Sequence, residues 1–132
     1  MKNILIKART CFYNINYHVV WTTNNRKEVL NSKIEDRVKE ILLKIAEDKD
    51  FFINKIDIRE CSQIDLFISA HPKISISYMV KMMKGISGRI IMKEFPEIDN
   101  ELWNPSYYVE TIGNISNEDI KNYIKCQERG DN

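Results

Sequence analysis

The sequence has little cysteine, histidine, glycine or proline, and each scarcity excludes a class of protein. Its three cysteines, Cys11, Cys61 and Cys126, lie far apart without a C-x-x-C pair, which argues against a disulfide framework and a cysteine zinc site. It has two histidines and no H-x-x-x-H, G-x-S-x-G or P-loop motif. The four glycines and three prolines form no low-complexity tract or linker.

A dominant charge and a long apolar run are also missing. The 20 Lys and Arg residues against 19 Asp and Glu residues leave a formal net charge of +1, so nucleic-acid binding would need a local basic patch. No apolar run approaches the roughly 20 residues that span a bilayer, and residues 1–10 lack the apolar core of a secretory signal. We therefore expect a cytoplasmic protein that makes no membrane contact, with residues 1–132 forming a single domain.

Apolar periodicity predicts an alternation of strands and helices. The expected elements are a strand over 13–21, a helix after Ser32, strands over 52–59 and 63–70, a helix over about 75–94, a strand over 107–112 and a capped helix after Ser116. This order matches an α+β, ferredoxin-like split βαβ fold. It implies an antiparallel four-stranded sheet with two helices on one face, followed by an appended C-terminal helix.

The same periodicity assigns side chains to faces. Over 52–59, Phe52, Ile56 and Ile58 are expected to share a face, and period two places Gln63 and Asp65 side by side on the next strand. The second helix is expected to bury a stripe of Met79, Met82, Met83, Ile86 and Ile90. Gly85 and Gly88 weaken that helix by ~1 kcal/mol each relative to Ala, which indicates that a close neighbour needs the room.

Charge is unevenly distributed along the chain. Residues 66–93 contain five basic side chains and no acidic one, namely Lys73, Lys81, Lys84, Arg89 and Lys93. On a helix, such a run gives a positive ridge that can neutralise phosphates.

Few residues offer catalytic chemistry. His18 lies on the polar side of the first strand, where a structural imidazole is expected, and His71 would be on the order of 20 Å from Asp65, too far to share a metal. Tyr123 and Gln127 are four apart on the last predicted helix and project together. A tyrosine hydroxyl can attack phosphorus and a glutamine oxygen can bind a divalent ion, although a core tyrosine is the alternative.

Several segments together resemble one family. They are Y-H-V-V-W-T-T-N-N-R (17–26), P-K-I-S-I-S-Y-M-V-K-M-M-K-G (72–85), K-E-F-P (93–96), L-W-N-P-S-Y-Y-V-E-T-I-G-N (102–114) and Y-I-K-C-Q (123–127). In order and spacing, residues 13–127 resemble the single-tyrosine HUH transposases (TnpA) of small insertion sequences that move as single-stranded DNA. The fold expected from periodicity is the one that this family implies.

The resemblance implies roles for particular residues. Tyr123 would attack a scissile phosphodiester of single-stranded DNA and form a 5′-phosphotyrosine, and Gln127 would help to hold a divalent ion. The family's other two ligands are histidines of a His-hydrophobic-His motif, but this chain has Gln63-Ile64-Asp65 in that place. Family members act as homodimers and bind DNA hairpins on a basic surface, for which the candidates here are Arg26, Lys73, Lys81, Lys84 and Arg89.

Three hypotheses follow from this replacement. We favour a transposase-family protein that binds hairpin or single-stranded DNA and has a degenerate metal site, so that cleavage is lost or reduced. The second is an active transposase in which Gln63, Asp65 and Gln127 hold Mg²⁺ or Mn²⁺ through oxygen atoms. The third is a ferredoxin-like protein-interaction module, which gains support unless Lys81, Lys84 and Arg89 form a contiguous positive groove.

Overall fold

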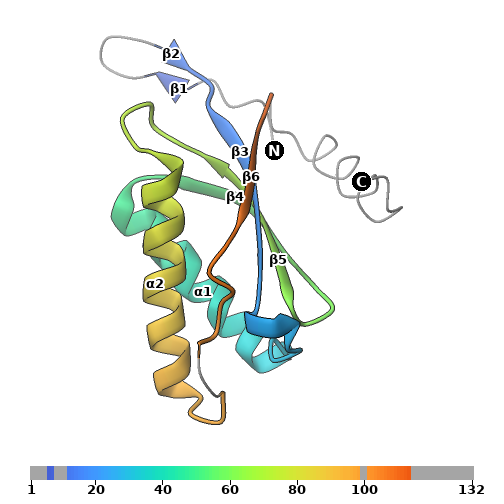
Figure 1. Cartoon of the computed structure of the whole chain (residues 1–132). Coiled ribbons are helices and arrows are strands. Elements are labelled where there is room, and N and C mark those ends of the chain that lie inside the picture. The colour runs from blue at the N-terminus through green and yellow to red at the C-terminus, as the bar shows by residue number, and fades with distance from the viewer. Residues whose placement is uncertain (1–5, 8–11, 99–100, 114–132) are drawn as a thin grey trace.

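A four-stranded antiparallel sheet carries two helices on one of its faces (Figure 1). The computed structural model describes residues 6–7, 12–98 and 101–113. Its elements are β1 (Ile6–Lys7), β2 (Phe12–Tyr13), β3 (Asn16–Thr22), the 3-10 turn η1 (Asn24–Arg26), α1 (Ser32–Lys49), β4 (Phe52–Arg59), β5 (Gln63–Ser69), α2 (Ile76–Glu94) and β6 (Tyr108–Ile112).

The strand order β4-β5-β3-β6 places the first long strand, β3, between β5 and β6. This is the ferredoxin-like arrangement, so the fold class predicted from the sequence is confirmed for the part that the structure describes. A separate pairing of β1 with β2 was not predicted. The expected helix after Ser116, with Tyr123 and Gln127, lies outside the described residues.

Both helices begin with a side-chain cap. Asn31 accepts a hydrogen bond from the Ile34 amide at the start of α1, and Ser75 accepts one from the Tyr78 amide at the start of α2. Arg37 of α1 donates two hydrogen bonds of 2.8 Å to the carboxylate of Glu94 at the end of α2. This bidentate pair joins α1 to the end of α2 at the protein surface.

The two faces of the sheet have different surroundings. Val19 and Trp21 of β3 and the apolar residues of β5 are buried together with side chains from both helices, and they form the core. The alternate residues of β3 and β5, which include His18, Gln63 and Asp65, point to the face opposite the helices.

Two side-chain predictions need correction. Phe52 does not share the core face with Ile56 and Ile58, because the register shifts between Ile53 and Lys55. Phe52 therefore pairs with Ser69 and is 61% exposed, whereas Ile53 packs against the core.

The buried face of α2 also differs from the predicted one, because the helix is rotated about its axis relative to that prediction. Met79 and Met83 are fully buried as expected, but Val80, Ser87 and Ile91 complete the buried set. Met82, Ile86 and Ile90 are only partly buried. Ser87 is buried because its hydroxyl bonds to the helix backbone and accepts a hydrogen bond from Trp103.

Candidate functional site

A buried polar network lies on the sheet face opposite the helices. Asp65 and His18 are both 0% exposed, and their Oδ2 and Nε2 atoms are 3.0 Å apart. Since an ionised carboxylate only accepts hydrogen bonds, the imidazole Nε2–H donates this bond. Gln63 donates a second bond, of 2.9 Å, from its amide nitrogen to Asp65 Oδ1. Gln63 and Asp65 therefore lie side by side, as period two predicted.

Register explains why a residue of another strand enters this network. Asp65 lies directly opposite Val20, and His18 lies opposite Phe67, so His18 and Asp65 are diagonal neighbours on one face. The imidazole also stacks on the Phe67 ring, with centroids 4.6 Å apart. The structural role predicted for His18 thus takes a definite form, as a donor to Asp65.

Charged side chains from the two edge strands complete the network. Arg59 of β4 places a guanidinium nitrogen 3.5 Å from Asp65 Oδ2, and a second nitrogen 3.4 Å from Asp57 Oδ2. From β6, Glu110 brings Oε2 to 3.9 Å from His18 Nδ1. Asp65 therefore has donors or cations from its own strand and from both neighbouring strands.

These contacts determine the protonation of Asp65. Burial alone would raise the pKa of this carboxyl group. The hydrogen bonds from His18 and Gln63 and the positive charge of Arg59 act in the opposite direction and prevail, so the pKa lies below its ordinary value. Asp65 is consequently a carboxylate at neutral pH.

The described donors fit a divalent ion poorly. Asp65 is the one carboxylate at the two motif positions, and His18, Gln63 and Arg59 already surround it. A divalent ion bound there would have to displace the Arg59 guanidinium, since like charges at that distance repel. Within residues 6–7, 12–98 and 101–113, no group of three His, Cys, Asp or Glu side chains could hold a metal ion.

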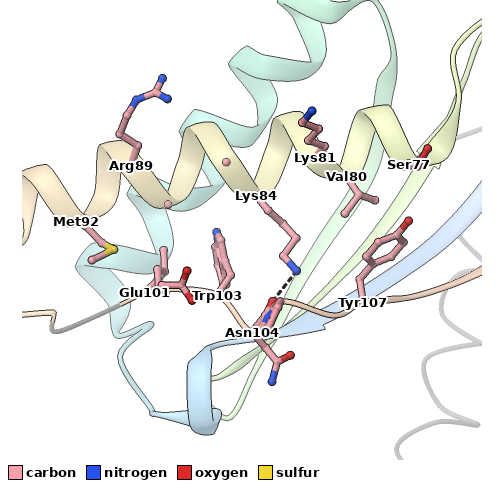
Figure 2. A pocket seen from close by; sticks show the side chains of 14 residues that line it. Ser77, Val80, Lys81, Lys84, Arg89, Met92, Glu101, Trp103, Asn104 and Tyr107 are labelled. Carbon is pink, nitrogen blue, oxygen red and sulfur yellow. Dashed lines mark hydrogen bonds between the residues drawn. The ribbon is translucent and has the colours of Figure 1, made fainter.

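A second candidate site is a groove of about 570 Å³ between α2 and residues 101–107 (Figure 2). Lys81, Lys84 and Arg89 all line it. We call it the α2 groove; its further lining residues are Ser77, Val80, Gly85, Gly88, Met92, Glu101, Leu102, Trp103, Asn104, Pro105 and Tyr107. The three basic residues that the sequence singled out for a groove thus line one groove, together with the acidic Glu101.

The three cations of the α2 groove are not equivalent. Lys81 and Arg89 are exposed on α2, whereas the Lys84 ammonium reaches across to donate to the backbone oxygen of Asn104 (Figure 2). It also donates to the backbone oxygen of Ser106. Lys84 also lies 5.8 Å from the Trp21 ring centroid and 5.9 Å from that of Tyr107. Burial lowers the pKa of Lys84. Lys84 therefore holds the wall of the groove, and Lys81 and Arg89 are the cations open to a ligand.

The other predicted site residues lie elsewhere. Arg26 follows the Thr22 end of β3, and Lys73 follows the strand end that pairs with Asn16, so these two lie toward opposite ends of the sheet and outside the α2 groove. Sequence reasoning missed Arg59 and the pairing of His18 with Asp65. Their positions on strands were visible in the sequence, but their contact depends on a register that periodicity alone does not give.

Membrane spanning finds no support in the described residues, whose helices are all too short or too polar to cross a bilayer. Location in the cytoplasm stays a prediction.

The fold and the polar face define a ferredoxin-like α+β protein with candidate sites on both sides of its sheet. The chain belongs to the family described as IS200-like transposases, whose family model matches residues 11–127.

Named relatives agree with this assignment. The chain is 30% identical over 126 residues to the ISDra2 transposase TnpA of Deinococcus radiodurans, covering 92% of this chain and 89% of that protein. It is 28% identical over 121 residues to the transposase for insertion sequence element IS200 of Salmonella typhimurium, covering 87% of this chain and 78% of that protein.

Solved structures show the same fold. A transposase crystal structure from Deinococcus radiodurans R1 superposes with a TM-score of 0.77 and 31% identity, covering 93% of this chain and 98% of that one. A REP-associated tyrosine transposase bound to a REP hairpin gives a TM-score of 0.60 at 14% identity, covering 96% and 75%. That second likeness concerns the fold alone.

Proposed function

We propose that this chain binds single-stranded or hairpin DNA and that its tyrosine-dependent cleavage of DNA is lost or reduced. The observation that carries the proposal is the surroundings of Asp65, which already accepts a hydrogen bond from His18 and lies 3.5 Å from the Arg59 guanidinium. A carboxylate in this state has little attraction left for a divalent ion. The α2 groove, which DNA binding would use, contains none of the residues of the Asp65 network.

DNA binding is supported by the α2 groove. Its exposed cations, Lys81 and Arg89, lie on a helix whose first acidic residue is Glu94, at its last position. We assign Arg26 and Lys73 to supporting phosphate contacts from the two ends of the sheet. A protein with the same fold, the REP-associated tyrosine transposase, was solved bound to a REP hairpin, which is consistent with a DNA ligand for this fold. A module that binds only protein is less favoured, because that hypothesis would gain support only if Lys81, Lys84 and Arg89 formed no common groove.

Cleavage would use Tyr123 as the nucleophile, with Gln127 as a ligand of Mg²⁺ or Mn²⁺. Both residues come from the resemblance and lie outside the described part of the chain. When bound, such an ion would stabilise charge on a phosphate. Gln63 and Asp65 are its remaining candidate ligands, and the contacts of Asp65 with Arg59 and His18 weigh against them.

We also propose that the protein acts as a homodimer, as the resemblance implies. The sheet ends in β4 on one side and β6 on the other among the described strands, and an unpaired sheet edge is a surface for pairing. Light scattering on the purified chain should give twice the mass of 15.6 kDa. A monomer at micromolar concentration would contradict this part of the proposal.

The decisive experiment is intact-mass spectrometry after incubation with single-stranded hairpin DNA from the flanks of its own gene. Reactions with Mg²⁺, with Mn²⁺ and with EDTA are run beside Tyr123→Phe, and the same DNA is used in a gel-shift assay. We expect a gel shift with little or no covalent adduct in all three reactions.

Other outcomes decide between the alternatives. A metal-dependent adduct that disappears in Tyr123→Phe would show an active transposase. Its loss also in Asp65→Ala, under conditions where circular dichroism shows that variant to be folded, would assign Asp65 as an oxygen ligand. The absence of any gel shift at low salt, where phosphate contacts are strongest, would overturn DNA binding and favour a protein-interaction module.

A further inference from the structure

Two acidic side chains lie directly opposite each other on the sheet face that carries no helices. In the register of β4 with β5, Asp57 pairs with Asp65, so their side chains project on the same face. Like charges at directly opposed positions of a sheet repel each other and destabilise it. Asp65 is also fully buried, and a buried carboxylate without a partner is costlier still. This pair of residues therefore requires a positive charge beside it.

Arg59 supplies that charge. It follows Asp57 by two residues on β4 and pairs with Gln63 of β5, so it lies on the same face. Its Nε atom lies 3.4 Å from Asp57 Oδ2, and its Nη2 atom lies 3.5 Å from Asp65 Oδ2. The guanidinium thus bridges both carboxylates. Because its side chain is only 20% exposed, water screens this attraction less than it would at the open surface.

The groups around the Arg59 guanidinium are those that a hard divalent ion prefers. Asp57 and Asp65 present carboxylate oxygens, and Gln63, which donates a hydrogen bond to Asp65, also carries an amide oxygen. A guanidinium and a divalent ion repel each other, so only one of them can lie between the two carboxylates. In this protein the position is held by a side chain of the protein itself.

We propose that Arg59 is the resident cation of this site and takes the position that a divalent ion would need. The protein therefore keeps its opposed carboxylates, Asp57 and Asp65, without a metal. Replacing Arg59 by a neutral residue should make the same site respond to divalent ions. This inference extends the part of the proposed function that concerns the metal, and it does not depend on DNA binding, because it is tested on the free protein.

The test measures the melting temperature of the free protein by circular dichroism, in EDTA and in about 10 mM Mn²⁺. The wild-type chain should melt at the same temperature in both solutions. Arg59→Gln should melt at a lower temperature than the wild type in EDTA, and Mn²⁺ should raise its melting temperature by about 4 °C, the shift expected for a weak site with a Kd of about 1 mM. Arg59→Lys keeps a positive charge and should not respond to Mn²⁺.

Arg37→Gln is the matched control. Arg37 also joins two carboxylates, those of Glu40 and Glu94, but it does so at the exposed surface of the helices. Its removal should create no response to Mn²⁺, because water already screens the charges that remain. A response of equal size in Arg37→Gln and Arg59→Gln would show a general effect of the ion and overturn the inference.

A second substitution tests the opposed carboxylates directly. Asp57→Asn, added to Arg59→Gln, should raise the melting temperature in EDTA above that of Arg59→Gln alone, because the repulsion with Asp65 is removed. It should also abolish the response to Mn²⁺. If Arg59→Gln alone does not fold, the double variant should fold, and its failure to do so would contradict the proposed role of Arg59.

Electron paramagnetic resonance of free Mn²⁺ counts the bound ions without reference to thermal stability. Arg59→Gln should bind an ion that the wild type and Arg59→Lys do not bind over the same concentration range. A folded Arg59→Gln that binds no Mn²⁺ would overturn the inference, and so would a wild-type chain that binds Mn²⁺ and loses it in Asp57→Asn. A lack of DNA binding would contradict the proposed function and leave this inference standing.

Discussion

Asp65 shows how neighbouring strands can match a buried carboxylate. It is a fully buried carboxylate, and its partners come from β3, β4 and β5. Removing one member of a buried pair leaves an unmatched polar group, which typically costs about 3–5 kcal/mol. The position that the resemblance assigns to metal binding is thus also a structural one here.

At this scale we predict that Asp65→Ala lowers the free energy of unfolding by about 3 kcal/mol. Asp57→Ala is the matched control, since its carboxylate is also near Arg59 but its side chain is 33% exposed, and it should cost less than about 1 kcal/mol. Urea denaturation measures both. Equal losses in the two variants would contradict the buried network.

Acid should remove the contribution of Asp65. Its pKa is lowered in the folded state, so the unfolded chain binds the proton more readily, and the stabilisation is present above the unfolded pKa of about 3.9. It is lost as the pH falls through the lower folded pKa. The difference in melting temperature between wild type and Asp65→Asn should therefore shrink as the pH drops from 6 towards 3. A constant difference would contradict this.

Sequence reasoning reached part of this site. Period two correctly placed Gln63 and Asp65 side by side, because alternation along one strand is a local property. It could not place His18 or Arg59 against Asp65, because those contacts cross between strands and follow from register and from the shift after Ile53. The bulge has no signal in the alternation of residues 52–59, which is why Phe52 was assigned to the wrong face.

At the scale of elements, the positions of the helices and strands were predicted better than the face that α2 buries. The long elements were predicted to within a few residues, since each has a strong apolar period and both helices have a capping side chain. The sequence did not predict which face of α2 is buried. The burial of Ser87 depends on the hydrogen bond that it accepts from Trp103, sixteen residues away in the chain.

The two glycines should respond differently to substitution. Gly85→Ala should raise the free energy of unfolding by about 1 kcal/mol, because nothing lies near the added methyl group. Gly88→Leu should lower it by about 1–3 kcal/mol, because its Cβ atom would already be in van der Waals contact with Trp103 at 3.5 Å and the longer side chain needs further room beside that ring. Thermal and urea denaturation test both, and a stabilised Gly88→Leu would contradict the described packing.

Lys84 links α2 to the segment before β6. Lys84→Met should remove its bonds to the oxygens of Asn104 and Ser106 and so increase hydrogen exchange in that segment. The Asn104 amide, which donates to Thr22, is the reporter. Lys81→Met is the control on the same helix, since its side chain is exposed. Unchanged exchange in Lys84→Met would show that the bonds do not hold the wall.

At the scale of the whole molecule, a net charge of +1 gives little general attraction for DNA. Binding should then depend on where the cations lie. Arg89→Gln and Lys44→Gln change the net charge equally, but Arg89 lines the α2 groove and Lys44 lies on α1 beside Glu47 and Asp48.

Salt titration separates these two cases. Arg89→Gln should weaken single-stranded DNA binding and reduce the slope of log K against log salt by about 0.7, the value for one phosphate contact. Lys44→Gln should change neither quantity. Identical effects of the two substitutions would show that binding follows total charge and not the groove.

The two tryptophans provide an optical reporter that needs no label. Trp21 in the core and Trp103 in the groove wall meet edge to face, with centroids 5.7 Å apart and planes at 80°. Indole rings this close and held at a fixed angle couple their transitions, so the pair should give a near-ultraviolet circular dichroism signal. Because Trp103 also pairs with Thr23 and bonds to Ser87, any displacement of the wall must alter that spectrum. Ligand binding in the α2 groove could thus be followed by the near-ultraviolet circular dichroism of the unlabelled protein.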